Sequence, residues 1–274
     1  MGRRAQFKYD GELARWWCRR AGDAAHARAY GNTVQFIHDS LGSAPARIID
    51  YACGAGHLLT RLCWRFPQSR FVGIDGSSFL LDRARRKLEC MGHPATSRVR
   101  LVHARLPDAR LRLARAGMAI FAFPNMVPSS GGQDSLGSGA ALSDDERAVA
   151  EALACWDDPD QSGLRDRPEA VLHWLLSGRL VSLDLRRLLI RGGTCVRVEY
   201  AKVKRHELSR ADLMRISFEE GSLDSEVNGR AAPQLFRVLA SRTYRSRVVE
   251  DVYQQTADEN DRTGGYVITL LQAL

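Results

Sequence analysis

The stretch Ile48–Leu59, IIDYACGAGHLL, decides how this chain folds. Two apolar residues lead to an acid at Asp50, a loop of small residues carries Gly54 and Gly56, and leucines follow at helical spacing. This order predicts a β-strand ending at Asp50, a glycine loop and a helix. Such a loop leaves main-chain amides and the positive end of a helix dipole at the sheet edge, where an anionic ligand group is favoured.

Strands and helices alternate on both sides of this loop. Strands over 46–50, 70–75, 99–104, 118–123 and 194–200 are predicted from their short apolar runs. Helical periodicity predicts two helices within 11–42 and further helices over 58–66 and 78–91. The alternation indicates a doubly wound, mostly parallel sheet with helices on both faces.

The connection between the fourth and fifth strands is too long for a simple crossover. Residues 128–167 begin with loop chemistry, and a capping box at Ser143–Glu146 predicts a helix start. Helices over 168–176 and 179–190 should follow, so we interpret this part as a helical insertion or lid.

The C-terminal part is expected to complete the sheet with an antiparallel pair. The patterns predict helices over 210–220 and 234–240, followed by strands over 246–256 and 263–274. Their short connection requires the two strands to be antiparallel.

Composition bounds the class of protein. Hydrophobic residues make up 45% of the 274, yet no run approaches the roughly 18 apolar residues of a membrane span, and the start lacks the apolar stretch of a secretory signal. We therefore expect a cytoplasmic protein without a membrane partner. The six cysteines have no metal-ligand spacing, so no metal site is expected. Residues 1–128 hold 21 Lys and Arg against 9 Asp and Glu, which makes acidic substrates or nucleic acid candidate partners.

An acid at the end of the next strand limits the classes of ligand that could bind. Asp75 follows Gly56 by 19 residues, and a carboxylate there can accept hydrogen bonds from both hydroxyls of a ribose. Both a dinucleotide and S-adenosylmethionine carry a ribose and an anionic tail. A dinucleotide fingerprint has a third glycine where this chain has Leu59, which favours S-adenosylmethionine. The alternative is a plain strand-to-helix turn that binds nothing.

The motifs D-Y-A-C-G-A-G at 50–56 and I-D-G-S at 74–77 resemble those of the class I, seven-stranded S-adenosylmethionine-dependent methyltransferases. The family's first motif is D-x-G-x-G-x-G, and Ala52 stands at its first glycine. The resemblance implies that the loop contacts the methionine end, that Asp75 binds the ribose and that residues after the third strand contact adenine, with Arg105 where the family often has Asp. The expected cofactor-binding residues are Asp50, Ala52, Gly54, Ala55, Gly56, His57, Asp75, Gly76, Ser77, His103, Ala104 and Arg105.

The resemblance also implies one domain over residues 1–274, an α/β fold with a doubly wound, mostly parallel seven-stranded sheet and an antiparallel C-terminal strand. We divide it into four parts. They are an N-terminal helical cap (1–45), a cofactor-binding half (46–127), a helical insertion and crossover (128–192) and the C-terminal half of the sheet (193–274).

Methyl transfer from a sulfonium needs mainly an aligned nucleophile and the exclusion of water. Asn125, just past the fourth strand, is our first candidate for positioning a substrate, and Glu199 or Tyr200 could accept a proton or orient it. The ring of Tyr30 could face the sulfonium. His57 is expected to help bind the cofactor's carboxylate, whereas His38 is interpreted as a surface or packed histidine.

Three functions remain open from the sequence. The first is a methyltransferase acting on an O or N atom of a small-molecule metabolite by in-line displacement, since the insertion could close a pocket. The second is an RNA or protein methyltransferase, which would need the arginine-rich segments 83–87 and 98–115 beside the cleft. The third is a non-catalytic partner subunit that keeps the fold. A homodimer is compatible with each.

Overall fold

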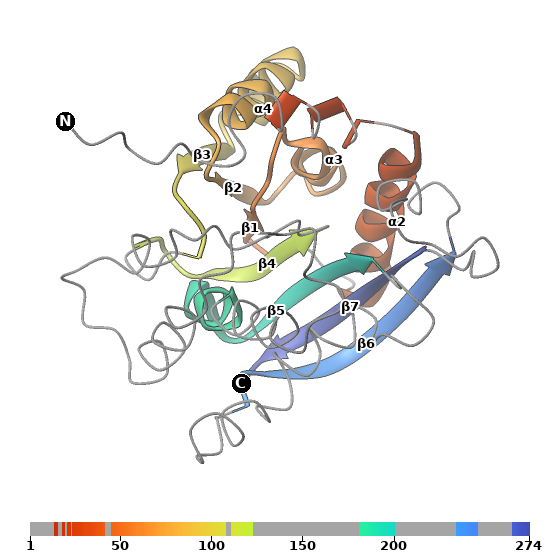
Figure 1. The fold of residues 1–274 in the computed structure, drawn as a ribbon. Helices are drawn as coiled ribbons and strands as arrows, with labels where there is room; N and C mark the ends of the chain where they lie inside the picture. The colour runs from red at the N-terminus through yellow and green to blue at the C-terminus, as the bar shows by residue number, and fades with distance from the viewer. Residues whose placement is uncertain are drawn as a thin grey trace, which may run out of the picture.

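The computed structural model describes residues 14–15, 18–19, 21–22, 24–41, 45–107, 111–122, 181–200, 234–245 and 265–274. Within these residues the chain forms a seven-stranded sheet in the order β3-β2-β1-β4-β5-β7-β6 (Figure 1). The strands are β1 (Arg47–Tyr51), β2 (Arg70–Asp75), β3 (Val99–His103), β4 (Ala116–Ala122), β5 (Leu189–Tyr200), β6 (Phe236–Arg245) and β7 (Gly265–Ala273).

The sheet is parallel from β3 to β5, and β7 runs antiparallel to both of its neighbours, as predicted. Strand order reverses at β1, which lies between β2 and β4. In open α/β sheets such a reversal leaves a crevice at the carboxyl ends of the strands, and ligands bind there. Asp50 lies near the carboxyl end of β1, so the sequence places its motif at that crevice.

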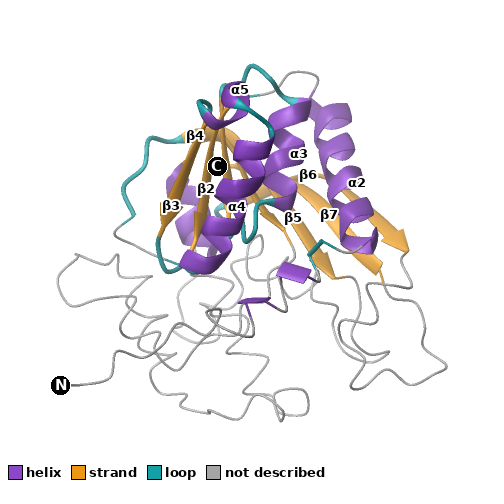
Figure 2. Cartoon of the chain, turned by 90° about the horizontal axis from the view of Figure 1, so that it is seen from above, coloured by secondary structure: helices purple, strands orange, loops and turns teal. Residues whose placement is uncertain are grey.

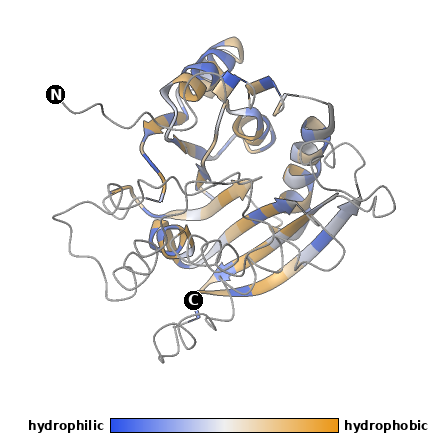
Figure 3. Cartoon of the chain, viewed as in Figure 1, coloured by the Kyte–Doolittle hydropathy of each residue, from blue (hydrophilic) through white to orange (hydrophobic). Residues whose placement is uncertain are grey.

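Helices cover both faces of the sheet. One face carries α2 (Ala24–Leu41), α3 (His57–Arg65) and α4 (Ser78–Cys90), which Figure 2 shows on the same side. The other face packs on a helix over residues 181–188. Successive side chains of β1 point to opposite faces of the sheet. Ile48 packs among the α2 and α3 side chains, and Ile49 packs with Leu185 on the other face. Figure 3 shows apolar residues along β4, which is buried on both faces.

Two predicted elements differ from the structure. The helix predicted over 234–240 is wrong, because this segment begins β6, whose residues pair with β7. A register shift between Val238 and Ala240 disturbs the alternation that would have identified a strand from sequence. The fifth strand begins at Leu189 rather than Thr194, and a short helix α5 (His93–Thr96) was not predicted.

Several predictions fall on residues outside the described part of the chain. They are most of the insertion, the helix over 210–220, the strand over 246–256 and Asn125. The division of the chain into four parts also stays a prediction. No helix among the described residues is long and apolar enough to cross a membrane.

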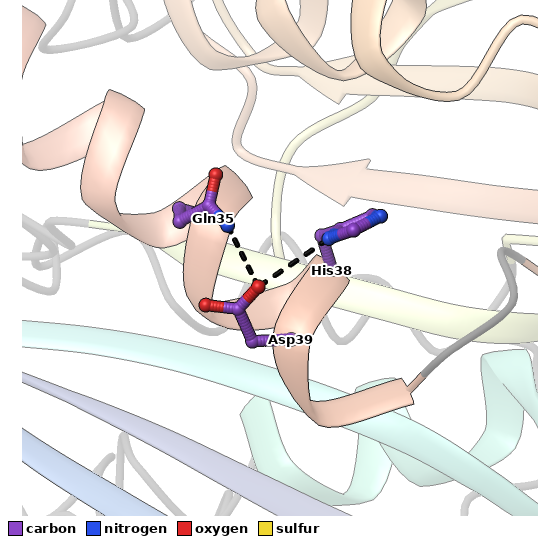
Figure 4. A network of polar contacts seen from close by, with 3 residues as sticks. All are labelled: Gln35, His38 and Asp39. Carbon is purple, nitrogen blue, oxygen red and sulfur yellow. Dashed lines mark hydrogen bonds and ion pairs between the residues drawn. The ribbon is translucent and has the colours of Figure 1, made fainter.

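The polar surface of α2 accounts for His38. Figure 4 shows this side chain beside Asp39, whose Oδ1 lies 3.4 Å from His38 Nδ1 and accepts a hydrogen bond of 2.7 Å from the Gln35 amide. Asp39 is exposed and His38 is partly exposed, so His38 lies at the surface, one of the two placements that the sequence left open.

Arg98, just before β3, forms hydrogen bonds to main-chain carbonyls of neighbouring segments. Its guanidinium donates to the oxygens of Phe66 and Ser69 from Nη1, of Cys63 from Nη2 and of Pro94 from Nε, at 2.9–3.2 Å. Its planar fork therefore satisfies carbonyls at the C-terminus of α3 and in the turn before β2.

Replacing Arg98 with Met should lower the free energy of unfolding by about 2–3 kcal/mol, because several part-buried carbonyls lose a charged donor. Chemical denaturation measures this change. Arg98→Lys should recover only part of the loss, since an ammonium cannot reach the same set of oxygens, whereas Arg100→Met on the exposed side of β3 should change stability by less than about 0.5 kcal/mol. An equal effect of Arg98→Met and Arg100→Met would contradict this role for Arg98.

Candidate cofactor site

Asp50 is a buried acid without a hydrogen-bond partner for one oxygen. Its side chain is 2% exposed, and Oδ2 has no partner among the described residues. Burial, followed by the nearby charge of Asp75, raises the pKa of Asp50 to about 8. A carboxyl group in this state is costly to ionise unless a cation or donor comes to it.

The glycine loop has a backbone that small residues suit best. Ala52, Gly54 and Gly56 all have positive φ angles, of 59°, 54° and 73°. A Cβ at Gly56 would lie 2.9 Å from the Cβ of Ala84, so this glycine lets α3 approach α4. A Cβ at Gly54 would meet no atom within 4 Å, which leaves open space beside the loop.

Most amides of the loop are used within the fold. Cys53 N donates to Ile74 O at 2.8 Å, Gly54 N to Asp75 Oδ2 at 2.8 Å and Gly56 N to Cys53 O at 3.0 Å. The expectation that the amides of 53–56 face a ligand therefore needs correction. The donors that remain for an anion belong to the N-terminus of α3, which has no side-chain cap.

Asp75 joins the loop to the next strand-to-helix turn. Besides Gly54 N, its carboxylate accepts a hydrogen bond of 2.9 Å from Ser77 N, and the side chain is 7% exposed. Burial raises the pKa of Asp75, while these main-chain donors act in the opposite direction. Ser77 also caps α4, since its hydroxyl accepts from Leu80 N at 3.3 Å.

The end of β3 lies against this acid. Ala104 N donates to Asp75 O at 3.0 Å, and His103 Nε2 lies 2.9 Å from Gly76 O. Both His103 and the following Arg105 are exposed. The structure thus brings the residues predicted for ribose and those predicted for adenine to one edge of the sheet.

His57 and Tyr30 lie together on the other side of the loop. Their rings stack with centroids 6.3 Å apart, and His57 Nε2 lies 2.6 Å from Lys87 Nζ. Burial, followed by the charges of Lys87 and Arg61, lowers the pKa of His57 to about 4. His57 is therefore neutral at physiological pH. Lys87 is half-buried, and it is not among the site residues predicted from sequence.

A signal for Lys87 was present in its spacing. It lies seven residues after Leu80 and three after Ala84, which are both buried on the inner face of α4. Positions separated by three, four and seven residues share one face of a helix.

The candidate catalytic residues at the end of β5 are placed differently from one another. Glu199 is 4% exposed and forms an ion pair with Arg197, whose guanidinium stacks over the ring of Phe121. Tyr200 ends β5, where its main chain pairs with Tyr266. A buried carboxylate held by a guanidinium is stabilised in its charged form and is less suited to accept a proton than a free one.

Residues 48–128 match the family model described as a methyltransferase domain. This segment is similar to methyltransferase domains. It contains β1 to β4 and therefore the whole loop and Asp75. Class I domains of this kind use S-adenosylmethionine, and the residues of this site fit that cofactor: an unpartnered buried carboxylate for an ammonium, an uncapped helix start for a carboxylate, and open space at Gly54.

Curated relatives match this chain over a short stretch. Trans-aconitate 2-methyltransferase from Acidovorax sp. (strain JS42) is 44% identical over 45 residues, which cover 16% of this chain and 17% of that protein. The enzyme of the same name from Methylobacterium nodulans (strain LMG 21967 / CNCM I-2342 / ORS 2060) is 41% identical over 46 residues, covering 17% and 18%. The match thus spans less than a fifth of the length of these relatives.

Solved structures share the fold over most of the chain. Magnesium protoporphyrin IX methyltransferase (ChlM) from Synechocystis PCC 6803 with bound SAM has a TM-score of 0.52 at 14% identity, covering 97% of this chain and 93% of that one. Geranyl diphosphate C-methyltransferase from Streptomyces coelicolor A3(2) has a TM-score of 0.52 at 12% identity, covering 98% and 86%. The [4+2]-cyclase SpnF also has a TM-score of 0.52, at 13% identity and covering 89% and 81%. These likenesses establish the class I methyltransferase fold.

The two glycines of the methyltransferase motif should respond differently to alanine. Gly54→Ala should lower the free energy of unfolding by about 1–2 kcal/mol, the cost of a positive φ at an L-residue. Gly56→Ala should cost about 1–3 kcal/mol more, because its Cβ would also press on Ala84. Urea denaturation distinguishes them, and equal losses would show that the contact with α4 is not tight.

The buried acid should make stability depend on pH in the absence of ligand. The pKa of Asp50 is raised on folding, so the folded state binds the proton more tightly and loses stability as pH rises from about 4 to about 8. Asp50→Asn mimics the protonated form and should flatten this part of the profile, although Asp75 still contributes with the same sign. Denaturation at pH 5 to 8 measures both proteins, and parallel profiles would show that Asp50 does not titrate in this range.

Proposed function

We propose that this chain is an S-adenosylmethionine-dependent methyltransferase that methylates an O or N atom of a small-molecule metabolite by in-line displacement. The observation that carries the proposal is the buried, unpartnered oxygen of Asp50, beneath a loop whose Gly54 leaves open space. A cationic ligand supplies what that oxygen lacks. A dinucleotide, which carries only anionic phosphates at the corresponding end, does not.

Each end of the cofactor has residues suited to it. The amino group would pair with Asp50, and the carboxylate would lie at the N-terminus of α3, where the helix dipole favours an anion. The ribose hydroxyls would donate to the carboxylate oxygens of Asp75, which accept Gly54 N and Ser77 N and still have lone pairs available. His103 and Ala104 contact the end of β2 at Asp75 and Gly76, and together with Arg105, which follows them, they would border the adenine.

The bound cofactor supplies a methyl carbon that is already electrophilic. A substrate oxygen or nitrogen would form the new bond to that carbon as the carbon–sulfur bond breaks, with the bonding pair leaving on sulfur. Any proton on the nucleophile would pass to a base or to water. The chain's own residues therefore mainly bind and align, and no covalent enzyme intermediate is required.

A small-molecule acceptor is supported by the relatives and by the geometry of the described residues. The named relatives act on trans-aconitate, geranyl diphosphate and magnesium protoporphyrin IX, all of which are small molecules. Tyr200, one of the residues proposed for the chemistry, ends β5, which pairs with β4. Asn125 follows β4 in the sequence and lies outside the described residues. The buried pairing of Glu199 with Arg197 makes Glu199 a positioning residue rather than the base in this proposal.

Binding of S-adenosylmethionine, measured by calorimetry, tests the cofactor assignment. Asp75→Asn should weaken binding by about tenfold to a hundredfold, because the ribose loses a charged acceptor. Asp82→Asn removes an exposed acid from α4 and should leave affinity within about twofold. The melting temperature of each variant separates a loss of folding from a loss of binding.

The acceptor is tested by transfer of a labelled methyl group. Product analysis by mass spectrometry after incubation with a panel of small carboxylic acids, alcohols and amines, with RNA in a parallel reaction, should find label in a small molecule. Because a cyclase shares the fold, turnover must be measured and not only binding. Wild-type protein that binds NAD but not S-adenosylmethionine would overturn the proposal, and label found only in RNA would overturn its substrate class.

A further inference from the structure

Lys87 lies between the glycine loop and the histidine that follows it. From the last turn of α4, its Nζ donates a hydrogen bond of 2.9 Å to Ala55 O and lies 2.6 Å from His57 Nε2. Ala55 is in the middle of the loop and is buried. One ammonium therefore contacts both the loop and the first residue of α3.

The protonation of His57 fixes the direction of this contact. The ring is neutral, so Nε2 can accept the proton that Lys87 offers, and the ring also hydrogen-bonds the main chain of Cys18. A Cβ at Gly22 would lie 3.1 Å from His57 Cε1. The described residues between 14 and 22, which we call the N-terminal segment, therefore pack closely on the ring. The Tyr30 ring of α2 stacks on the same imidazole.

Apolar contacts bring the same N-terminal segment onto the loop. Ala14 and Cys18 pack with Ala55 of the loop and Leu80 of α4. The N-terminal residues are thus attached at two points, by a small apolar cluster and by the chain of polar contacts from Lys87 through His57 to Cys18. Both attachments end at the loop that borders the cofactor site.

We propose that Lys87 is a positioning residue that holds the glycine loop and the N-terminal segment together in the form that binds the cofactor. It fixes the Ala55 carbonyl directly and the N-terminal segment through His57. A hydrocarbon side chain at this position would leave the Ala55 oxygen and His57 Nε2 without their donor, so the loop would sample other conformations. The inference rests on the proposed function, because it concerns the affinity for S-adenosylmethionine.

Because Lys87 carries a charge, its effect on cofactor binding should depend on pH, which an effect of packing alone would not. Burial, with the charges of Arg61 on α3 and Arg83 on α4, lowers the pKa of Lys87 to about 8, although Cys18 acts in the opposite direction. A charged donor makes stronger hydrogen bonds than a neutral amine. The contribution of Lys87 should therefore decrease as pH rises through about 8.

Calorimetry with S-adenosylmethionine on the full chain tests this inference. Lys87→Met, which keeps the aliphatic stem, should raise Kd about tenfold at pH 7. Arg70→Met removes a cation from the exposed, opposite end of β2 and should leave Kd within about twofold. Melting temperatures confirm that both variants are folded.

The pH profile completes the test. The ratio of Kd for Lys87→Met to Kd for wild type should fall toward one between pH 7 and pH 9, and Asp50, which titrates in both proteins, cancels from this ratio. A ratio of one at pH 7, or one that stays constant across this range, would overturn the positioning role while wild type still binds. Wild-type protein that binds no S-adenosylmethionine would instead overturn the proposed function, so the two failures are distinguishable.

Discussion

The hydrogen bond from Gly54 N to the carboxylate of Asp75 is the interaction on which the cofactor site depends. It joins the loop after β1 to the end of β2, and the same carboxylate holds Ser77 at the start of α4. Two strand-to-helix turns are thereby fixed by one side chain. A left-handed backbone at residues 52, 54 and 56 is sparsely populated in a free chain, so it persists only where contacts such as this one determine it.

Charge is distributed unevenly around this loop. The acids Asp50 and Asp75 lie at the ends of β1 and β2. Burial, followed by the charges of these two acids, raises the pKa of the nearby Cys53 thiol. Lys87, Arg61 and His57 lie on the side of α3 and α4. A ligand with a cationic centre and an anionic end matches both sides at once, whereas a purely anionic ligand would meet the acids unfavourably.

The parts of the site that sequence could predict are those fixed by local geometry. Gly54, Gly56 and Asp75 occupy positions that follow from a strand, a turn and a helix in series, and the parallel order of β1 to β4 follows from the alternation of elements. The spacing of Lys87 places it on the inner face of α4, but sequence does not identify what it contacts there. The partners of Lys87 and Arg98 lie about 30 residues away and are mostly main-chain oxygens, which carry no residue-specific signal. β6 was misassigned for a related reason, since its identity comes from pairing with β7 across a register shift.

Asp50 shows why the strained and unpartnered features of this chain occur together. A buried carboxyl with an unpartnered oxygen does not stabilise the fold. A neutral side chain such as asparagine or serine at this position would carry a smaller desolvation cost. Ala52 also costs stability, because its backbone is left-handed, a conformation that glycine would adopt without strain. Both residues stand at the crevice formed where the strand order reverses. These two local costs to the empty protein therefore lie where a ligand can compensate for them, which is the arrangement expected when binding free energy and folding free energy are linked.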